Sequence, residues 1–288
     1  MIGTRAAFAI GLATIGLVLL LGSGGSDPGI AITAQRMVAE RAVEADAALA
    51  ALELGMAPAL DAARRAGARV VAGDEEAGPL FGEAATLLSD LDSRAVRDAV
   101  ARLDGARQAA TPGAPRLGAP VESGELASIA AQLDGTAGAA DTFVVMRRRA
   151  ERLAGALDDG LGALERGDVA AAADHVAAAR EDHGVVAGWD VGLPTLPLWI
   201  DTMDAMIGAM ERLVTATRDD DADAASAAAS HVASVGDDAA TADRALRIAI
   251  SEGGAAVSSA PLGRLADVLG RVREARATMA LILQTAGR

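Results

Sequence analysis

The sequence predicts an all-α protein, in which an N-terminal transmembrane helix is followed by an extracytoplasmic helical bundle of antiparallel hairpins. Hydrophobic residues make up 51% of the 288 residues but aromatic residues only 2%, so the core must be built from small and aliphatic side chains. Strands favour β-branched and aromatic residues, whereas this chain has no Tyr and only three Phe. Apolar residues recur every three or four positions, as they do on one face of a helix.

The charge composition restricts the classes of function. All 26 basic residues are Arg, 40 residues are acidic, and the net charge is −14. Such an acidic, Lys-free composition is typical of a halophilic protein, although a GC-rich codon bias alone would also remove Lys. The charge repels phosphate, so we expect no nucleic-acid partner. The absence of Cys and Lys excludes a thiol nucleophile, a Cys-ligated metal and a Schiff base.

The N-terminal region contains the most apolar part of the chain. Ala6 to Gly22 is an uncharged run of 17 residues preceded by Arg5, which is close to the minimum length of a membrane-spanning helix. We predict a cytoplasmic tail over residues 1–5 and a transmembrane anchor or signal sequence over 6–26. An uncleaved anchor is favoured because no A-x-A cleavage site closely follows the run. A cleaved signal and a buried core helix are the alternatives.

This assignment predicts the location of the protein. Because Arg5 is expected to remain inside, the chain is predicted to be a single-pass protein of the cell membrane, with its N-terminus inside and its body extracytoplasmic. Residues 27–34, which contain Pro and Gly, are predicted to be a linker to that body.

The body is predicted to have two parts. Residues 35–110 are expected to form an N-terminal helical subdomain, with a turn at 73–79 where Gly and Pro enclose acidic residues. Residues 111–124 are rich in proline and glycine, which predicts a linker. Residues 125–288 are expected to form a C-terminal helical bundle.

Several elements are expected within this bundle. Helices are predicted over about 126–133 and 141–165 from their leucine spacing. Gly167 suits the position just after a helix end and Asp168 the N-cap of the next helix. The acidic run at 219–221 is expected to begin another helix in the same way.

The end of the chain and a weak repeat complete the prediction. Residues 251–261 read SEGGAAVSSAP, which predicts the last turn, and Pro261 suits the first turn of a final helix. AAADHVAAAREDH around His175 resembles AAASHVASVGDDA around His231, at an offset of 56 residues. The repeat predicts two helical hairpins joined by the segment that contains the tryptophans.

The same repeat supplies a hypothesis for metal binding. The candidate ligands are His175, Asp182, His231 and Asp238. In each half the two residues are seven apart and share a helix face, and facing helices that offer His and carboxylates can bind a metal in a bundle core. No E-x-x-H pair accompanies them, so the alternative that they face water is favoured, and no cofactor is predicted.

The segment from Gly188 to Met206 contains both tryptophans. Pro194 and Pro197 interrupt a helix here, and the resulting connection is long for a bundle, as functional loops often are. Because aromatic residues concentrate binding energy, Trp189, Trp199, Asp190 and Asp201 are candidate ligand- or partner-binding residues. The alternative is that the tryptophans pack on the bundle. This alternative is favoured for Trp199, which shares a helix face with the core-type stripe of Met203, Met206 and Met210.

The charged clusters and motifs do not indicate an enzyme. Arg147, Arg148, Arg149 and Arg152 form a basic cluster, which is expected to pair with Glu151 and other acids rather than with anionic lipid. The chain has no G-x-S-x-G, H-E-x-x-H or G-x-G-x-x-G motif. We therefore predict a protein without catalytic activity.

The sequence thus predicts a membrane-anchored, extracytoplasmic helical protein that acts as a non-catalytic interaction or structural accessory module. Its predicted partners are the lipid bilayer, through residues 6–26, and a membrane or cell-surface protein. The alternative is a ligand- or metal-binding helical domain that acts with a separate membrane partner.

Overall fold

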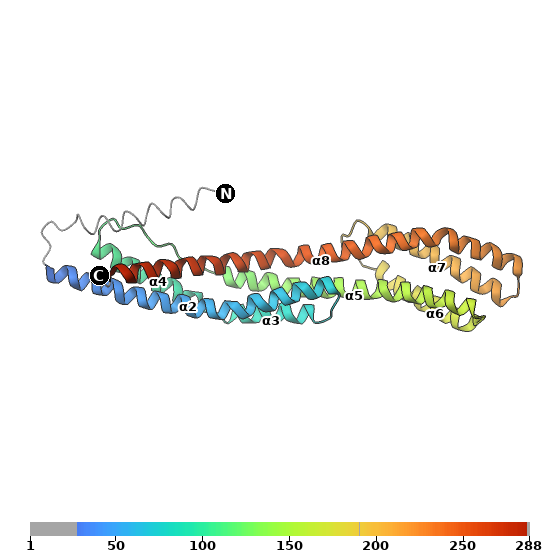
Figure 1. Ribbon diagram of the computed structural model, residues 1–288, viewed down its shortest axis with the longest axis horizontal. Coiled ribbons are helices and arrows are strands. Elements are labelled where there is room, and N and C mark those ends of the chain that lie inside the picture. The colour runs from blue at the N-terminus through green and yellow to red at the C-terminus, as the bar shows by residue number, and fades with distance from the viewer. Residues whose placement is uncertain (1–27, 190, 287–288) are drawn as a thin grey trace. The chain divides into compact units, whose positions relative to one another are not determined.

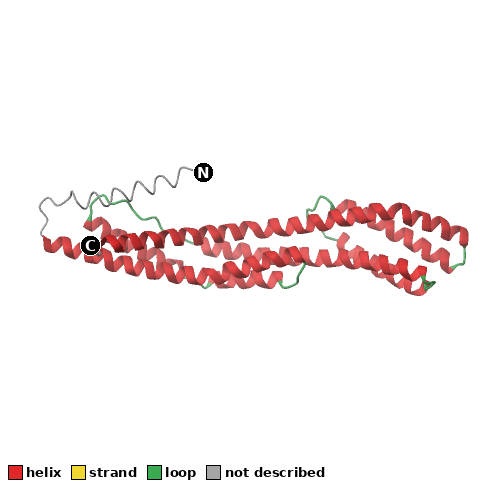
Figure 2. Ribbon diagram, in the orientation of Figure 1, coloured by secondary structure: helices red, strands yellow, loops and turns green. Residues whose placement is uncertain are grey.

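The protein is all-α, as predicted. The structure, a computed structural model, describes residues 28–189 and 191–286. Within these residues it consists of α-helices joined by turns and loops, without a strand (Figure 2). In chain order (Figure 1), the helices are α2 (Pro28–Ala72), α3 (Ala77–Ser89), α4 (Ser93–Ala110), α5 (Glu125–Glu165), α6 (Val169–Ala187), α7 (Leu196–Arg218) and α8 (Ala222–Ala286).

The predicted membrane segment is not part of this description. None of the described helices is long and apolar enough to cross a membrane. The predicted tail, residues 1–5, and the predicted anchor, residues 6–26, lie outside the described residues. The predicted linker at 27–34 is corrected, because residues 28–34 belong to α2. Pro28 begins this helix, where its fixed φ suits the first turn and its missing N–H is not needed.

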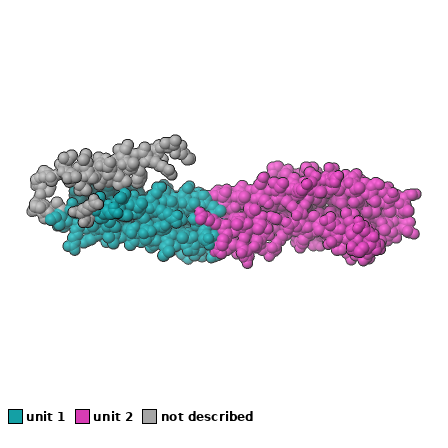
Figure 3. Space-filling view, in the orientation of Figure 1, with its two compact units in different colours: residues 1–63, 82–134, 261–288 teal, residues 64–81, 135–260 magenta. Residues whose placement is uncertain are grey.

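The helices form two compact units, which Figure 3 shows in different colours. Unit 1 contains the described part of residues 1–63, together with 82–134 and the described part of 261–288. Unit 2 contains residues 64–81 and 135–260. This division differs from the predicted one into 35–110 and 125–288, because α2, α5 and α8 are long enough to supply residues to both units.

Unit 1 is an antiparallel helical bundle. Helices α3 and α4 together run back along α2: Leu91, which follows α3, packs against Gly55, and Arg102 of α4 lies 3.7 Å from the carboxylate of Glu44. Residues 111–124 connect α4 to α5, and both helices contribute to unit 1. A hydrogen bond holds this connection against α4: the backbone N–H of Leu117 donates to the carboxylate of Asp104 at 2.8 Å.

Helix α8 packs antiparallel to α2 in unit 1, and ion pairs fix the register of the two helices. Arg273 donates to Glu53 at 2.7 Å, while Arg276 donates to Glu53 at 2.8 Å and to Asp46 at 3.2 Å. The hydrogen bonds from Arg276 and then from Arg273 lower the pKa of Glu53 below its usual value. A carboxylate with a lowered pKa stabilises the folded state only while it is ionised.

We therefore expect Glu53 to make the stability of the protein depend on pH. Its contribution is complete above the unfolded-state pKa of about 4.3 and is lost as pH falls through the lower folded-state pKa. Glu53→Gln should lower the unfolding midpoint near neutral pH, and its difference from wild type should shrink as pH falls through the lowered pKa of Glu53. Thermal unfolding across this range measures both quantities. Glu83→Gln, an exposed change on α3, is the control, and an equal loss in the control would contradict the prediction.

The predicted turn at 251–261 is wrong, because α8 is one helix that continues through these residues and includes Pro261. The glycines here serve close packing within unit 2. A Cβ atom at Gly254 would overlap Cγ1 of Val70, and one at Gly253 would lie 3.1 Å from the ring of Phe143. The hydroxyl of Ser258 donates to the carbonyl of Gly254 at 2.8 Å, so this Ser is also accommodated inside the helix.

Helix α5 corrects a second prediction. It is one helix from Glu125 to Glu165, so the predicted break between 126–133 and 141–165 is wrong. The turn after it is confirmed. Gly167 has φ +77°, its N–H donates to the carbonyl of Leu164, and the carboxylate of Asp168 accepts from the N–H of Ala171 at 3.0 Å. This is a Schellman helix end followed directly by an N-cap.

The turn between α7 and α8 has the same geometry without a glycine. Asp220 has φ +56°, its N–H donates to the carbonyl of Thr217, and the carboxylate of Asp221 accepts from the N–H of Ala224 at 3.0 Å. The two turns therefore repeat at an offset of 53 residues, which differs from the offset of 56 between His175 and His231. A difference of three residues rotates a side chain by about 60° on the helix, so the two histidines are not structurally equivalent.

Candidate functional site: the tryptophan segment and its polar network

The tryptophan segment connects α6 to α7 in unit 2. Helix α6 ends at Ala187, and α7 begins at Leu196 with Pro197 in its first turn. Trp189 lies in the connection and is half-buried, Asp190 lies outside the described residues, and Asp201 is exposed on α7. Trp189 and Asp201 are therefore at least partly accessible. They lie in different elements, the connection and α7.

Trp199 is fully buried, with 0% of its surface exposed. Its indole N–H donates to the carboxylate of Asp243 on α8 at 3.4 Å, and its ring stacks on that of His183 from α6, with centroids 6.0 Å apart. Nε2 of His183 lies 3.0 Å from the carbonyl of Ile200. Met203, Met206 and Met210 are also buried, so the core-packing interpretation of the methionine stripe is confirmed and Trp199 has no surface to offer a partner.

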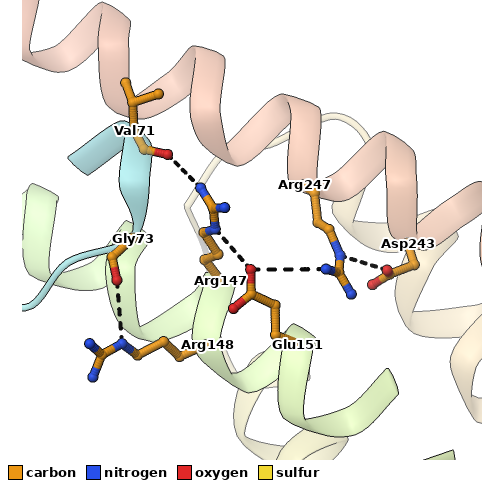
Figure 4. Close-up of polar contacts among 7 residues, drawn as sticks. All are labelled: Val71, Gly73, Arg147, Arg148, Glu151, Asp243 and Arg247. Atoms are coloured by element: carbon orange, nitrogen blue, oxygen red, sulfur yellow. Dashed lines mark hydrogen bonds and ion pairs between the residues drawn. The ribbon is translucent and has the colours of Figure 1, made fainter. Parts of the chain in front are cut away.

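A polar network extends from Asp243, which accepts the indole N–H of Trp199, across α8 and α5. Figure 4 shows the network from Asp243 onward. Arg247 donates to the buried carboxylate of Asp243 at 2.7 Å and lies 3.9 Å from the carboxylate of Glu151. Glu151 in turn accepts from Nε of Arg147 at 3.0 Å. Glu151 therefore lies between the guanidinium groups of Arg147 and Arg247, whereas Asp243 accepts from one cation, Arg247, and from the indole of Trp199.

The network ends at the C-terminus of α2. There Arg147 donates to the carbonyl of Val71, and Arg148 donates to the carbonyl of Gly73 at 3.3 Å (Figure 4). The last carbonyls of a helix have no partner within the helix and carry partial negative charge. Arg147 therefore caps one of the last carbonyls of α2, and Arg148 binds the residue that follows the helix.

Asp182, a predicted metal ligand, lies in a second ionic centre of unit 2. It is buried, and its carboxylate accepts hydrogen bonds from Arg149 and from Arg152, the latter at 2.9 Å. The predicted pairing of the basic cluster with Glu151 and other acids is thus confirmed. A carboxylate held by two guanidinium groups is already neutralised, which leaves it poorly suited to bind a cation.

The other predicted metal ligands are not brought together with Asp182. His175 is partly exposed on α6, whereas His231 and Asp238 are exposed on α8. Within residues 28–189 and 191–286, no group of three or more metal-binding side chains is arranged to hold an ion. His231 does line a surface groove of about 660 Å³ between α7 and α8, together with Glu211, Arg212 and Asp221. The metal hypothesis therefore receives no support from the geometry.

Sequence reasoning missed Asp243 and His183 as partners of Trp199. One signal was available for Asp243: it precedes Arg247 by four residues and lies on an otherwise apolar helix face with Leu246 and Ile250. A buried indole N–H needs an acceptor, so a carboxylate on an apolar face is a natural partner. Nothing in the sequence indicates which helix faces Trp199.

The network has the chemistry of a structural element. Its carboxylates accept from Arg or Trp, and it contains no hydroxyl or amine nucleophile beside a base, which acyl transfer and related reactions require. Comparison of the chain with protein-family models, with curated proteins and with solved structures found no match.

Proposed function

We propose that the protein is a non-catalytic interaction module, held at the extracytoplasmic face of the cell membrane through residues 6–26. One observation supports an interaction function most directly: among the large apolar side chains that are exposed on α2, three lie on one face. They are Ile32, Val43 and Leu54, with 66%, 56% and 77% of their surface exposed. They follow one another at intervals of 11 residues, which is close to three helical turns, and therefore share one face.

This exposed face contrasts with the opposite side of α2, which is fully packed. Ala42, Ala45, Leu49 and Met56 have 0% exposure in the core of unit 1. Single exposed apolar residues need no explanation, but an aligned set of large apolar side chains indicates a contact surface. The membrane location rests on the uncharged run from Ala6 to Gly22 and the arginine that precedes it.

Site-specific photo-cross-linking in native membranes tests this function. A photoreactive residue at position 54 of the full chain should cross-link to a protein, whereas one at position 248 should not. Ile248 is the matched control, because it is also apolar and exposed, at 59%, but lies on α8. Equal cross-linking at both positions, or none at position 54, would contradict an interaction surface on α2.

The alternative, a ligand-binding domain, is tested by thermal unfolding of the full chain with divalent metals and small solutes. A ligand that binds only the folded state raises the unfolding midpoint. A reproducible increase of the unfolding midpoint with one ligand, together with no cross-link at position 54, would contradict the interaction module. The same result would support a ligand-binding domain.

A further inference from the structure

We propose that the end of unit 1 at which α2 begins contacts an anionic lipid surface. This inference rests on the proposed membrane attachment through residues 6–26 and names the class of lipid. We call this part of unit 1 the acid-free end and define it by three segments: residues 28–39 of α2, residues 105–121 of α4 and the connection after it, and residues 275–286 of α8. None of these segments contains Asp or Glu, although 40 of the 288 residues of the chain are acidic.

Contacts between the helices place the three segments together. Arg276 of α8 donates to Asp46 of α2 at 3.2 Å, and the two helices are antiparallel, so the last turns of α8 lie beside the first turns of α2. Arg102 of α4 lies 3.7 Å from Glu44 of α2, and α4 also runs toward the start of α2. The start of α2 and the end of α8 are thus found at the same end of unit 1 (Figure 1).

The length of chain before α2 keeps this end near the proposed anchor. The uncharged run ends at Gly22 and α2 begins at Pro28, so only residues 23–27 join them. Five residues extend at most about 18 Å. When the run spans the bilayer, as proposed, the first turn of α2 therefore stays close to the lipid headgroups.

The absence of carboxylates matches an anionic surface in particular. Such a surface repels carboxylates over about one Debye length, roughly 8–10 Å, and a chain with a charge of −14 would be repelled if its acids reached this end. Glu40 is the first acidic residue of α2, and it lies about 18 Å along the helix from Pro28. Asp27, the only acidic residue before Glu40, lies outside the described residues. An apolar partner would explain exposed apolar side chains at this end, but not the missing carboxylates.

The acid-free end also presents basic groups. Arg116 is exposed and has no ion pair within residues 28–189 and 191–286. Its neighbours are fixed, because the carbonyl of Pro115 and the N–H of Leu117 are both bound to side chains of α4. Arg36 pairs with Glu40 in an exposed pair one helix turn long, which contributes little stability and leaves other N–H donors of the guanidinium free. Guanidinium groups bind phosphate oxygens through charge-assisted hydrogen bonds.

Exposed apolar side chains lie beside these arginines. They are Ile32, Met37 and Leu281, with 66%, 47% and 42% of their surface exposed. Apolar side chains next to basic ones bind at the boundary between headgroups and acyl chains, where both kinds of group find partners. The acid-free end therefore offers the groups that an anionic lipid surface binds and lacks those that it repels.

Fluorescence quenching by a labelled lipid tests the proposal, because the chain has no Cys of its own. M37C, L281C and L54C are made separately in the full chain, labelled with a thiol-reactive fluorophore and reconstituted into vesicles. The vesicles contain phosphatidylcholine alone or mixed equally with phosphatidylglycerol, and a lipid that carries a nitroxide on its headgroup. Labels at positions 37 and 281 should be quenched more in the anionic vesicles. Molar salt should remove this difference, because it shortens the Debye length to about 3 Å.

Position 54 is the control for the labels, and three charge variants extend the test. Leu54 is exposed on the same helix but lies about 26 Å beyond Met37, so its label should be quenched equally little in both kinds of vesicle. Gln35→Glu, read with the label at 281, and Gln284→Glu, read with the label at 37, each place a carboxylate on the acid-free end. Each should lower the ratio of bound to unbound ends about fivefold in anionic vesicles, the effect of one charge near such a surface. Gln132→Glu is the matched control, because Gln132 is exposed in unit 1 but lies outside the three segments, and it should leave the ratio unchanged.

Three results would overturn the contact. Equal quenching at positions 37 and 281 in neutral and anionic vesicles would show that the end does not bind anionic lipid. An equal loss with Gln132→Glu and Gln35→Glu would show that only the net charge of the chain matters. Quenching at position 54 as strong as at position 37 would show that α2 lies along the membrane.

Flotation of the same vesicles separates this contact from the proposed attachment. If the full chain floats with both kinds of vesicle but gives one of the three results above, the contact fails and the attachment through residues 6–26 stands. If the chain floats with neither, the attachment fails and the contact fails with it. The interaction surface on α2 is decided separately, by photo-cross-linking at position 54.

Discussion

Replacing Trp199 by alanine is expected to lower the free energy of unfolding by about 3–5 kcal/mol, as for other fully buried large side chains. The expectation follows from three properties of the side chain. It is fully buried, its ring stacks on His183, and its N–H donates to Asp243. Truncation removes the packing and leaves the buried carboxylate of Asp243 without one of its donors, which adds a desolvation penalty. Urea unfolding followed by far-ultraviolet circular dichroism measures the loss without depending on either tryptophan as a fluorophore.

Trp189→Ala is the matched control for this prediction. Trp189 is the same residue type in the same segment, but it is half-buried and lies outside the helices, so its truncation should cost less than about 1.5 kcal/mol. Trp199→Phe keeps most of the packing and removes only the donor to Asp243, which should cost about 1–2 kcal/mol. If Trp199→Ala lowered the free energy of unfolding no more than Trp189→Ala does, the prediction that the buried Trp199 stabilises this core would be wrong.

The helical character of the protein could be predicted from sequence because it depends on local properties. Apolar spacing, capping residues and turn residues act within a few positions of each other. Gly167 and Asp168 illustrate this, since the observed helix end and N-cap use only bonds to residues within five positions. The turn predicted at 73–79 is confirmed over 73–76 for the same reason, with Gly73 at φ +75°, but residues 77–79 already belong to α3.

The division into units could not be predicted from sequence, because it depends on long-range pairing. The helix-face pattern marks Asp182 as a candidate metal ligand, but its partners in the structure are Arg149 and Arg152, which are 33 and 30 positions away. The capping of α2 by Arg147 depends on a residue 76 positions from Val71. A single sequence shows that such groups need partners, but it does not show which helix supplies them.

The region 251–261 shows how tertiary packing overrides a local signal. Glycine, serine and proline are the residues of turns, and they were interpreted as a turn here. In α8 they have other functions. Gly253 and Gly254 leave room for side chains of neighbouring helices, and the hydroxyl of Ser258 donates to a backbone carbonyl of the same helix. The same composition is therefore compatible with a turn and with a close contact between helices. Only the residues that pack against it, which belong to other helices, decide between the two.

Gly254 provides the most direct test of that explanation. Gly254→Ala is expected to lower the free energy of unfolding by up to about 2 kcal/mol, although alanine is by itself the better helix former. The added Cβ would overlap Cγ1 of Val70, and Val is stiff at its first side-chain torsion. Overpacking of a core typically costs about 1–3 kcal/mol, against which the higher helix propensity of Ala returns about 1 kcal/mol. Chemical unfolding of the full chain measures the difference.

Two further variants separate packing from propensity. Gly236 lies in the same helix and the same unit, and a Cβ there meets nothing within 4 Å. Gly236→Ala should therefore raise the free energy of unfolding by about 1 kcal/mol, so the same substitution has opposite signs at the two positions. Val70→Ala removes the methyl groups that a Cβ at Gly254 would meet, and in that background Gly254→Ala should no longer be destabilising, a coupling of about 1 kcal/mol or more. A stabilising Gly254→Ala in the wild-type background would mean that α8 does not pass Val70 closely.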